Sequence, residues 1–177
     1  MERTLDADWV RDFGLRYAAA WNVRDPDRVA ELLDEDIVWR EPSLGEPARG
    51  LPAVVDVLEK MWRAFPDHRV QFLPWLEDPF ISADGGACSV SWVSTGRFTG
   101  FMVPPGLAPT GLSFELDGIE VWRFRNERLL TAQSFYDVLG LCRQIGLFPA
   151  RGSVAEQVAV HLQRLTPMGL TLLRKGA

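Results

Sequence analysis

Apolar residues recur every three or four positions in the first part of the chain. Residues 6–22 place Trp9, Phe13 and Tyr17 on one face, which predicts an amphipathic helix. The same spacing predicts further helices over residues 25–33, 51–64, 137–146 and 152–174. The chain is therefore expected to begin with three helices and to end with two.

After residue 65 the apolar period changes from helical to two, which favours strands because successive strand side chains point to opposite faces. Alternating strands are predicted over residues 68–78, 87–100, 112–124 and 128–137, and an earlier one over residues 36–41. Asp84-Gly85-Gly86 is typical of a hairpin turn, and Arg125-Asn126-Glu127 is a weaker turn signal.

Helices followed by a meander of strands predict an α+β fold, with a curved sheet wrapped around the N-terminal helices. Such a sheet, closed on one side by helices, leaves a cone-shaped space. The chain has seven Trp and ten Phe among 177 residues, so aromatic side chains are available to line that space. We therefore expect a cavity for an apolar small molecule.

Charge and the rare residue types narrow the range of partners. The formal net charge of -5 argues against nucleic acid as a partner. No apolar run reaches the roughly 20 residues of a membrane span, and the start of the chain lacks a signal-peptide pattern, so a cytoplasmic protein without membrane partners is expected. Cys88 and Cys142 are expected to be buried free thiols, and two histidines are too few to suggest a zinc site.

Several short motifs follow one another in a characteristic order. They are WNVRDPDRVAELLDEDIVWREP, RG, FPD, PTG and YDVLGLCRQIG. In this order and spacing, over roughly residues 9–147, they resemble the SnoaL-like polyketide cyclase group of the nuclear-transport-factor-2-like superfamily. The resemblance implies a cone-shaped barrel, an apolar cavity, a homodimer and intramolecular aldol chemistry without a cofactor. Residues 1–149 would form this domain, and residues 150–177 a C-terminal helical extension.

The implied chemistry needs a carboxylate that removes a proton from a carbon next to a carbonyl, and a donor that stabilises the enolate oxygen. Asp137 is the first candidate, because the cyclases and the related limonene-epoxide hydrolases carry a functional aspartate at this place. The alternative is purely structural, since an aspartate before VLGLCRQ is also well placed to cap a helix.

A second candidate set follows from the resemblance to the ketosteroid-isomerase branch. There the donor is a tyrosine on the first helix and the base is an aspartate before a proline, which correspond here to Tyr17 and to Glu41 before Pro42. A third acidic position falls at Glu120. Strand parity places Glu41 and Glu120 on faces that also carry Trp and Phe, as expected for carboxyl groups kept away from water.

Structural roles remain open for these residues. The two glutamates can equally be rim carboxylates paired with Arg40, Arg123 or Arg125, and Tyr17 can be an ordinary core tyrosine. Aromatic residues on the predicted inner faces and loops are the candidates for substrate binding: Trp39, Trp62, Trp92, Phe98, Phe101, Trp122, Phe124 and Phe135.

The sequence departs from two family patterns. Phe98 stands where the cyclases often carry a histidine in a TG-x-H-T-G stretch. Phe101 and Val103 stand where the epoxide hydrolases place an Arg-x-Asp pair, which argues against epoxide opening. His68 is expected to be a surface imidazole at a strand edge, with a role at the pocket mouth as the alternative, and His161 a packing or interface residue.

Three classes of function therefore stay open. The first is a cofactor-independent cyclase or isomerase that acts on a polyketide or another polycyclic apolar carbonyl compound. The second is a non-catalytic binder of such a compound, and the third a protein-interaction module. The amphipathic helix at residues 152–174 is expected to close the cone or to pack across a dimer.

Overall fold

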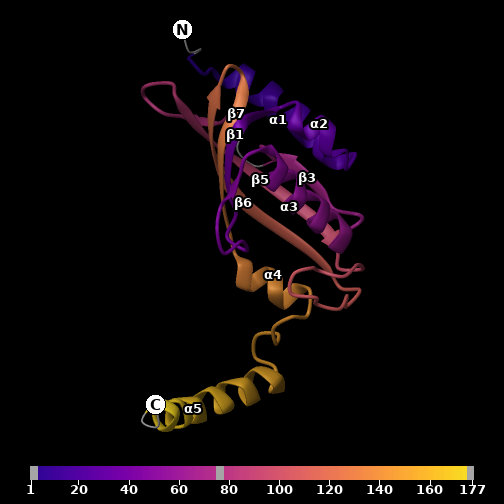
Figure 1. Ribbon diagram of the computed structural model, residues 1–177, viewed down its shortest axis with the longest axis vertical. Coiled ribbons are helices and arrows are strands. Elements are labelled where there is room, and N and C mark those ends of the chain that lie inside the picture. The colour runs from indigo at the N-terminus through magenta and orange to yellow at the C-terminus, as the bar shows by residue number, and fades with distance from the viewer. Residues whose placement is uncertain (1–3, 75–77, 175–177) are drawn as a thin grey trace.

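A computed structural model describes residues 4–74 and 78–174, with side chains up to residue 164 (Figure 1). The helices are α1 (Ala7–Asn22), α2 (Pro26–Ala30), α3 (Leu51–Ala64), α4 (Val138–Gln144) and α5 (Val154–Arg174). The strands are β1 (Leu33–Arg40), β2 (Ala48–Arg49), β3 (Arg69–Phe72), β4 (Phe80–Ile81), β5 (Ala87–Arg97), β6 (Ser113–Arg125) and β7 (Arg128–Tyr136). Each predicted helix and strand has a counterpart, but two are shorter than predicted: α2 ends at Ala30, and β3 ends at Phe72. Residues 75–77 of the strand predicted over residues 68–78 lie outside the described residues. The pattern missed β2 and β4, because two residues are too few to show a period.

The strands form one mixed sheet, in the order β2-β1-β7-β6-β5-β3, with β4 beside β5. β1 and β7 run parallel, and the other pairs are antiparallel. Helices α1 and α3 cover one side of the curved sheet (Figure 1). The predicted α+β cone is confirmed.

A tight hairpin joins β6 to β7. Asn126 and Glu127 both have positive φ, 50° and 63°, as a two-residue turn of the type I′ kind requires. A register shift between Arg123 and Phe124 then places Glu120 of β6 opposite Ser134 of β7. The pairing with β5 places the same residue opposite Val90. Even-numbered residues of β6 therefore face the helices, and Glu120 is buried among them.

Aromatic side chains of α1 fill the part of the cone near the end of β6. Phe13 packs edge-on against Trp122 and Phe124, with ring centroids 5.5 Å and 4.8 Å apart. Tyr17 stacks on Phe72 in the same cluster. This half of the concave face is solid core, so any cavity must lie farther along the strands.

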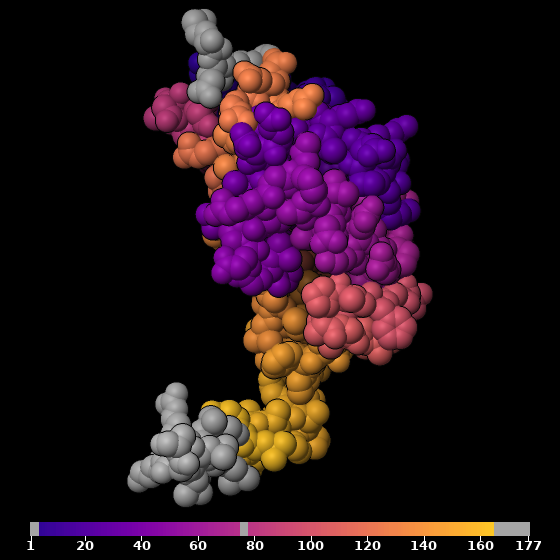
Figure 2. Space-filling model, viewed as in Figure 1, coloured from indigo at the N-terminus to yellow at the C-terminus, as the bar shows by residue number. Residues whose placement is uncertain are grey.

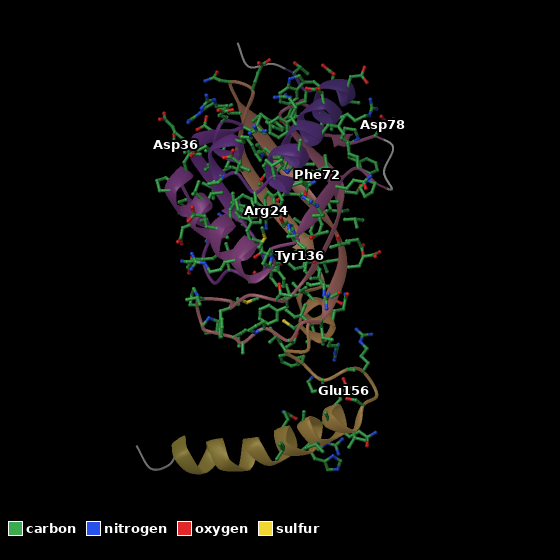
Figure 3. All side chains as sticks on the ribbon, turned by 90° about the vertical axis from the view of Figure 1, so that its right-hand side faces the viewer. Arg24, Asp36, Phe72, Asp78, Tyr136 and Glu156 are labelled. Atoms are coloured by element: carbon green, nitrogen blue, oxygen red, sulfur yellow. The ribbon has the colours of Figure 1, made fainter. Side chains whose placement is uncertain are left out.

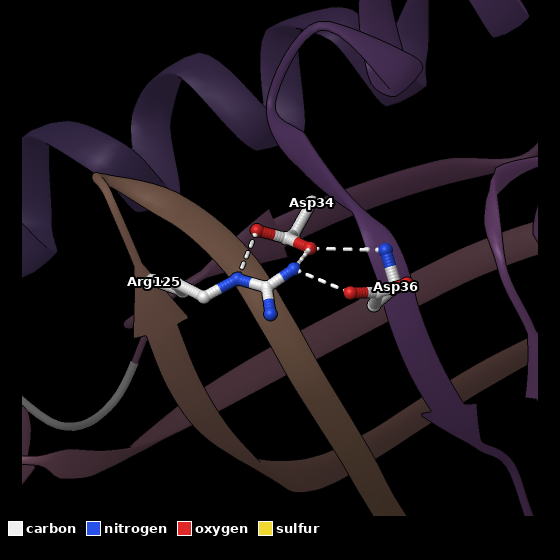
Figure 4. A network of polar contacts seen from close by, with 3 residues as sticks. All are labelled: Asp34, Asp36 and Arg125. Carbon is white, nitrogen blue, oxygen red and sulfur yellow. Dashed lines mark hydrogen bonds and ion pairs between the residues drawn. The ribbon is translucent and has the colours of Figure 1, made fainter.

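An ion pair fixes the end of β6 to the start of β1 (Figure 4). Arg125 Nε donates to Asp34 Oδ2 over 2.9 Å, and its Nη2 donates to both Asp34 and Asp36. Asp34 is buried and also accepts the backbone N–H of Asp36. These two carboxylates, and not Glu120, are the partners of the arginine.

Helix α5 projects from the body beyond α4 (Figures 1 and 2). Arg143 of α4 donates to Glu156 over 3.0 Å and to the Pro149 carbonyl over 3.3 Å, which anchors the start of α5. Val154, Val158 and Leu162 on this helix are exposed. Within the described residues, no helix is long and apolar enough to cross a membrane.

Candidate functional site

A cavity of about 520 Å³ opens between the concave face of the sheet, α3, α4 and the loop that carries Met102 to Pro105. Its wall is mainly apolar, and in Figure 3 the lining residues Phe72 and Tyr136 lie within the body of the cone. The side chains on the wall that can ionise or carry a hydroxyl are Glu41, Ser43, Lys60, His68, Ser94, Glu120, Ser134, Tyr136 and Cys142. The size suits a small organic ligand.

Glu120 is the most deeply placed acid on the cavity wall, with only 4% of its surface exposed. Ser134 Oγ donates to its Oε1 over 2.6 Å, and Trp122 Nε1 donates to its Oε2 over 2.8 Å. Burial raises the pKa of Glu120, and these donors oppose the rise because they favour the ionised form. Among the described residues, no arginine pairs with Glu120, unlike the alternative that the sequence left open.

The indole of Trp39 faces the same carboxyl group. Its proximity also favours ionised Glu120 and so lowers the pKa of that carboxyl. The N–H of Trp39 nevertheless meets no hydrogen-bond partner in the described part of the chain, although the side chain is buried and lines the cavity. The N–H therefore lies near the Glu120 carboxyl group without completing a hydrogen bond to it, and a ligand oxygen bound beside Glu120 would give this buried donor an acceptor.

Glu41 lies on the cavity wall directly after β1. Its Oε2 accepts the backbone N–H of Ser43 over 3.1 Å and also the Ser43 hydroxyl. Burial and the nearby negative charge of Glu120 raise the pKa of Glu41, while the two Ser43 donors lower it. The cavity therefore brings together two carboxyl groups that influence each other's ionisation.

Tyr17 lies behind this pair and is not part of the cavity wall. It is buried against Phe13, Trp21, Phe72 and Trp122. Burial, with a smaller contribution from Glu120, raises its pKa well above the usual value, so the phenol stays neutral. Glu120 thus acts electrostatically on both Tyr17 and Glu41, but only the two glutamates reach the cavity.

Asp137 is exposed and does not line the cavity. It is the N-cap of α4, and its Oδ1 accepts the backbone N–H of Gly140 over 2.8 Å. This is the capping geometry that the sequence left open as the alternative. The structure therefore places the first candidate outside the site that holds the other two carboxyl groups.

His68 is buried and lines the cavity, so the expectation of a surface imidazole is wrong. Trp21 Nε1 donates to its Nδ1 over 2.9 Å, and its Nε2 lies 2.6 Å from Ser94 Oγ. Burial lowers the pKa of His68 to about 4. A signal existed in the sequence, because His68 shares strand parity with Val70 and Phe72, two other lining residues.

The eight aromatic candidates for substrate binding divide into three groups. Trp39 and Trp92 line the cavity. Trp62, Phe98 and Trp122 are buried in the core, and Phe124 is half-buried against α1. Phe101 and Phe135 are exposed. The six residues of the second and third groups do not line the cavity.

Trp92 reaches the cavity because a glycine lies opposite it. Gly118 is its partner on β6, and a Cβ at that position would come within 2.5 Å of the indole ring. The ring therefore lies across the bare backbone of β6. Any side chain at residue 118 would push it out of this position.

In the described part of the chain, the cysteines form no disulfide and, with the histidines, no metal site. Both cysteines are free thiols: Cys88 is buried, which raises its pKa to about 12, whereas Cys142 is only half-buried, contrary to expectation. His161 is exposed on α5. Across residues 4–74 and 78–174, no group of three His, Cys, Asp or Glu side chains could hold a metal ion.

Comparison with known proteins identifies a family and a fold that match this chain. The model of the SnoaL-like polyketide cyclase family matches residues 11–145. No curated protein sequence matches the chain. Many solved structures share the fold, and three of them show the range of their names.

A protein from Jannaschia sp. CCS1, named as a candidate SnoaL-like polyketide cyclase, has 16% identity and a TM-score of 0.67, covering 84% of this chain and 99% of its own. AclR from Streptomyces galilaeus, named as a candidate hydroxylase, has 18% identity and a TM-score of 0.66, covering 93% and 98%. A protein with a ketosteroid-isomerase-like fold from Catenulispora acidiphila has 16% identity and a TM-score of 0.60, covering 76% and 92%. Since their names span different chemistries, the likeness identifies the fold and not the reaction.

Proposed function

This chain belongs to the SnoaL-like polyketide cyclase family, and we propose that it is a cofactor-independent cyclase or isomerase of a polycyclic apolar carbonyl compound. The observation that carries the proposal is the buried Glu120 on the wall of an apolar cavity, beside a second acid, Glu41. An acid held away from water keeps its proton at a higher pH than usual, which suits proton transfer near neutrality.

The two acids are suited to different tasks. Glu41 is less buried, and both Ser43 donors act on Oε2, which leaves Oε1 free to accept a proton from carbon. Glu120 is deeper, so it is the better candidate to stay protonated and to donate to the oxygen that becomes negative. The N–H of Trp39 can add a second donor to the same oxygen.

The reaction then balances within the ligand and the two side chains. Glu41 removes a proton from the carbon next to a carbonyl, and Glu120 and Trp39 stabilise the enolate oxygen. In a cyclase the enolate carbon attacks a second carbonyl of the same molecule, and Glu120 gives its proton to the new alkoxide. The proton taken up by Glu41 then returns to Glu120, which restores both side chains for the next turnover. In an isomerase Glu41 returns the proton to another carbon. The apolar wall supports both reactions, because it folds the ligand and excludes water.

Asp137 has no part in this proposal, since its carboxylate caps α4 outside the cavity.

The expected homodimer is also part of the proposal. It is supported by Ile119 and Phe135, an exposed apolar pair on neighbouring strands of the outer sheet face. Sedimentation measurements on the wild type and Phe135→Glu test it, because the charged variant should be monomeric.

Proton exchange in D₂O tests the acid–base role without knowledge of the natural substrate. The probe is 2-tetralone, a ketone with an acidic CH₂ group, and NMR follows its deuteration. Glu41→Gln and Glu120→Gln should each slow the catalysed exchange by about 100-fold or more. Asp137→Asn should leave it unchanged. If both glutamine variants bind the ketone and exchange it at the wild-type rate, the protein is a binder and the catalytic proposal fails.

A further inference from the structure

His68 and Ser94 form a second polar point on the cavity wall that the acid–base pair does not use. We propose that the Ser94 hydroxyl donates a hydrogen bond to a carbonyl or phenol oxygen at the far end of the ligand. The ligand would then be an elongated polycycle with oxygen atoms at both ends. Only the assignment of the reacting end rests on the proposed function.

The tautomer of His68 follows from its partner on α1. An indole N–H can only donate, so the Nδ1 atom that receives the Trp21 bond must be without a proton. A neutral imidazole carries its proton on the other nitrogen, so Nε2–H donates to Ser94 Oγ over 2.6 Å. The low pKa of His68, about 4, keeps the ring neutral near pH 7.

This order of bonds leaves one proton unassigned. The Ser94 oxygen accepts from His68, so its own O–H must find another acceptor, and the structure records no other hydrogen bond of this hydroxyl among the described residues. Ser94 is buried on the inner face of β5 and lines the cavity. Its proton is therefore available to whatever fills the cavity, where an oxygen atom would be its acceptor.

The strand register gives the distance between the two polar points. Glu120 lies opposite Val90, and Ser94 lies four residues farther along β5, opposite Leu116. Four residues of strand correspond to about 13 Å. Apolar residues such as Trp92 lie between these points. A molecule of three or four fused rings with an oxygen at each end fits this arrangement better than a single ring.

The hydrogen-bond order can be tested on the protein without a ligand. ¹⁵N NMR of the histidines should show Nδ1 of His68 unprotonated and Nε2 protonated at pH 7. In Trp21→Phe, where the donor is lost, this preference should weaken. If the wild type carries the proton on Nδ1, Ser94 must donate to Nε2 and has no proton left for a ligand, which overturns the proposal.

A rigid diketone tests the binding role. Androst-4-ene-3,17-dione has a ketone at each end of four fused rings, and calorimetry measures its affinity. Ser94→Ala should weaken binding about fivefold, the equivalent of one ordinary hydrogen bond. Ser94→Thr, which keeps a hydroxyl, should restore affinity. Ser91→Ala is the matched control, because Ser91 lies on the same strand and does not line the cavity.

Infrared spectra of the bound diketone separate this inference from the catalytic proposal. One carbonyl stretch should shift to lower frequency in the wild type, lose that shift in Ser94→Ala and keep it in Glu120→Gln. Wild-type protein that does not bind the diketone would overturn the ligand class. Unchanged affinity and spectrum in a folded Ser94→Ala protein would overturn the role of Ser94, whatever the result of the exchange assay with 2-tetralone.

Discussion

Trp122 donates its indole N–H to Glu120 from two residues farther along the same strand, over 2.8 Å. Both side chains point inward because they are separated by one full period of the strand. The indole belongs to the aromatic cluster with α1, whereas the carboxyl group belongs to the cavity wall. A rigid core residue thus holds the acid in place at the boundary between the two regions.

Removing the other donor to this acid should make Glu120 harder to ionise. In Ser134→Ala the carboxylate loses a hydrogen bond of about 1 kcal/mol, while the Trp122 bond remains. The pKa of Glu120 should therefore rise above its wild-type value, as ¹³C NMR of the labelled carboxyl group can measure. A lower or unchanged pKa would mean that the hydroxyl does not stabilise the charge. Ser91→Ala should leave the pKa unchanged.

Burial of Glu120 should cost stability as the pH rises above the usual pKa of a glutamate. Its pKa is raised in the folded protein, so its favourable contribution is complete below the usual range and is lost as pH rises through the folded pKa. Glu120→Gln removes this dependence, and its amide can still accept from Trp122 and donate to Ser134. Urea unfolding at several pH values should show the variant gaining stability relative to the wild type as pH rises. A constant difference between the two would contradict the raised pKa.

His68 should have the opposite effect at acidic pH. Its pKa falls from 6.5 to about 4 on folding, so the unfolded chain binds more protons between these values. Stability from this residue is therefore complete above pH 6.5 and is lost as pH falls towards 4, by about 3 kcal/mol in total. His68→Gln keeps an acceptor for Trp21 and a donor for Ser94 but cannot titrate. Its unfolding free energy should fall less steeply between pH 6.5 and 4 than that of the wild type.

The sequence predicted the fold well because its two periods change sharply near residue 65. Parity also identified Glu41 and Glu120 as inward-facing acids. It could not show where the concave face is solid, since that depends on how α1 packs. Trp122 and Phe124 share parity with Glu120, yet Phe13 covers them. Phe135 has the parity opposite to Ser134, so it faces outward and the smaller residue reaches the site.

The role of His68 depends on contacts between distant segments. The imidazole precedes β3, its two partners lie on α1 and β5, and nothing in the local sequence indicates either bond. Asp137 presents the reverse case. The motif suggested a catalytic aspartate and the local sequence suggested a cap, and only the three-dimensional position of the carboxylate separates the two.

The ion pair at the start of β1 should contribute more through Asp34 than through Asp36. Asp34 is buried and accepts two bonds from Arg125, which hold its pKa below the usual value, whereas Asp36 is exposed. Asp34→Asn should destabilise the fold by about 1–3 kcal/mol. Asp36→Asn should cost less than about 1 kcal/mol, as for a surface pair. If urea unfolding shows that the two variants lose equal free energies of unfolding, burial does not distinguish the two carboxylates.

Two substitutions at Asp137 separate capping from catalysis. Asparagine caps a helix about as well as aspartate, so Asp137→Asn should retain both stability and ketone exchange. Asp137→Ala removes the acceptor of the Gly140 N–H and should cost about 1 kcal/mol in thermal or urea unfolding. Because Val138, Leu141 and Cys142 of α4 line the cavity, the alanine variant should also bind the ligand less tightly. If Asp137→Asn keeps its stability but no longer catalyses proton exchange of the ketone, Asp137 takes part in the reaction.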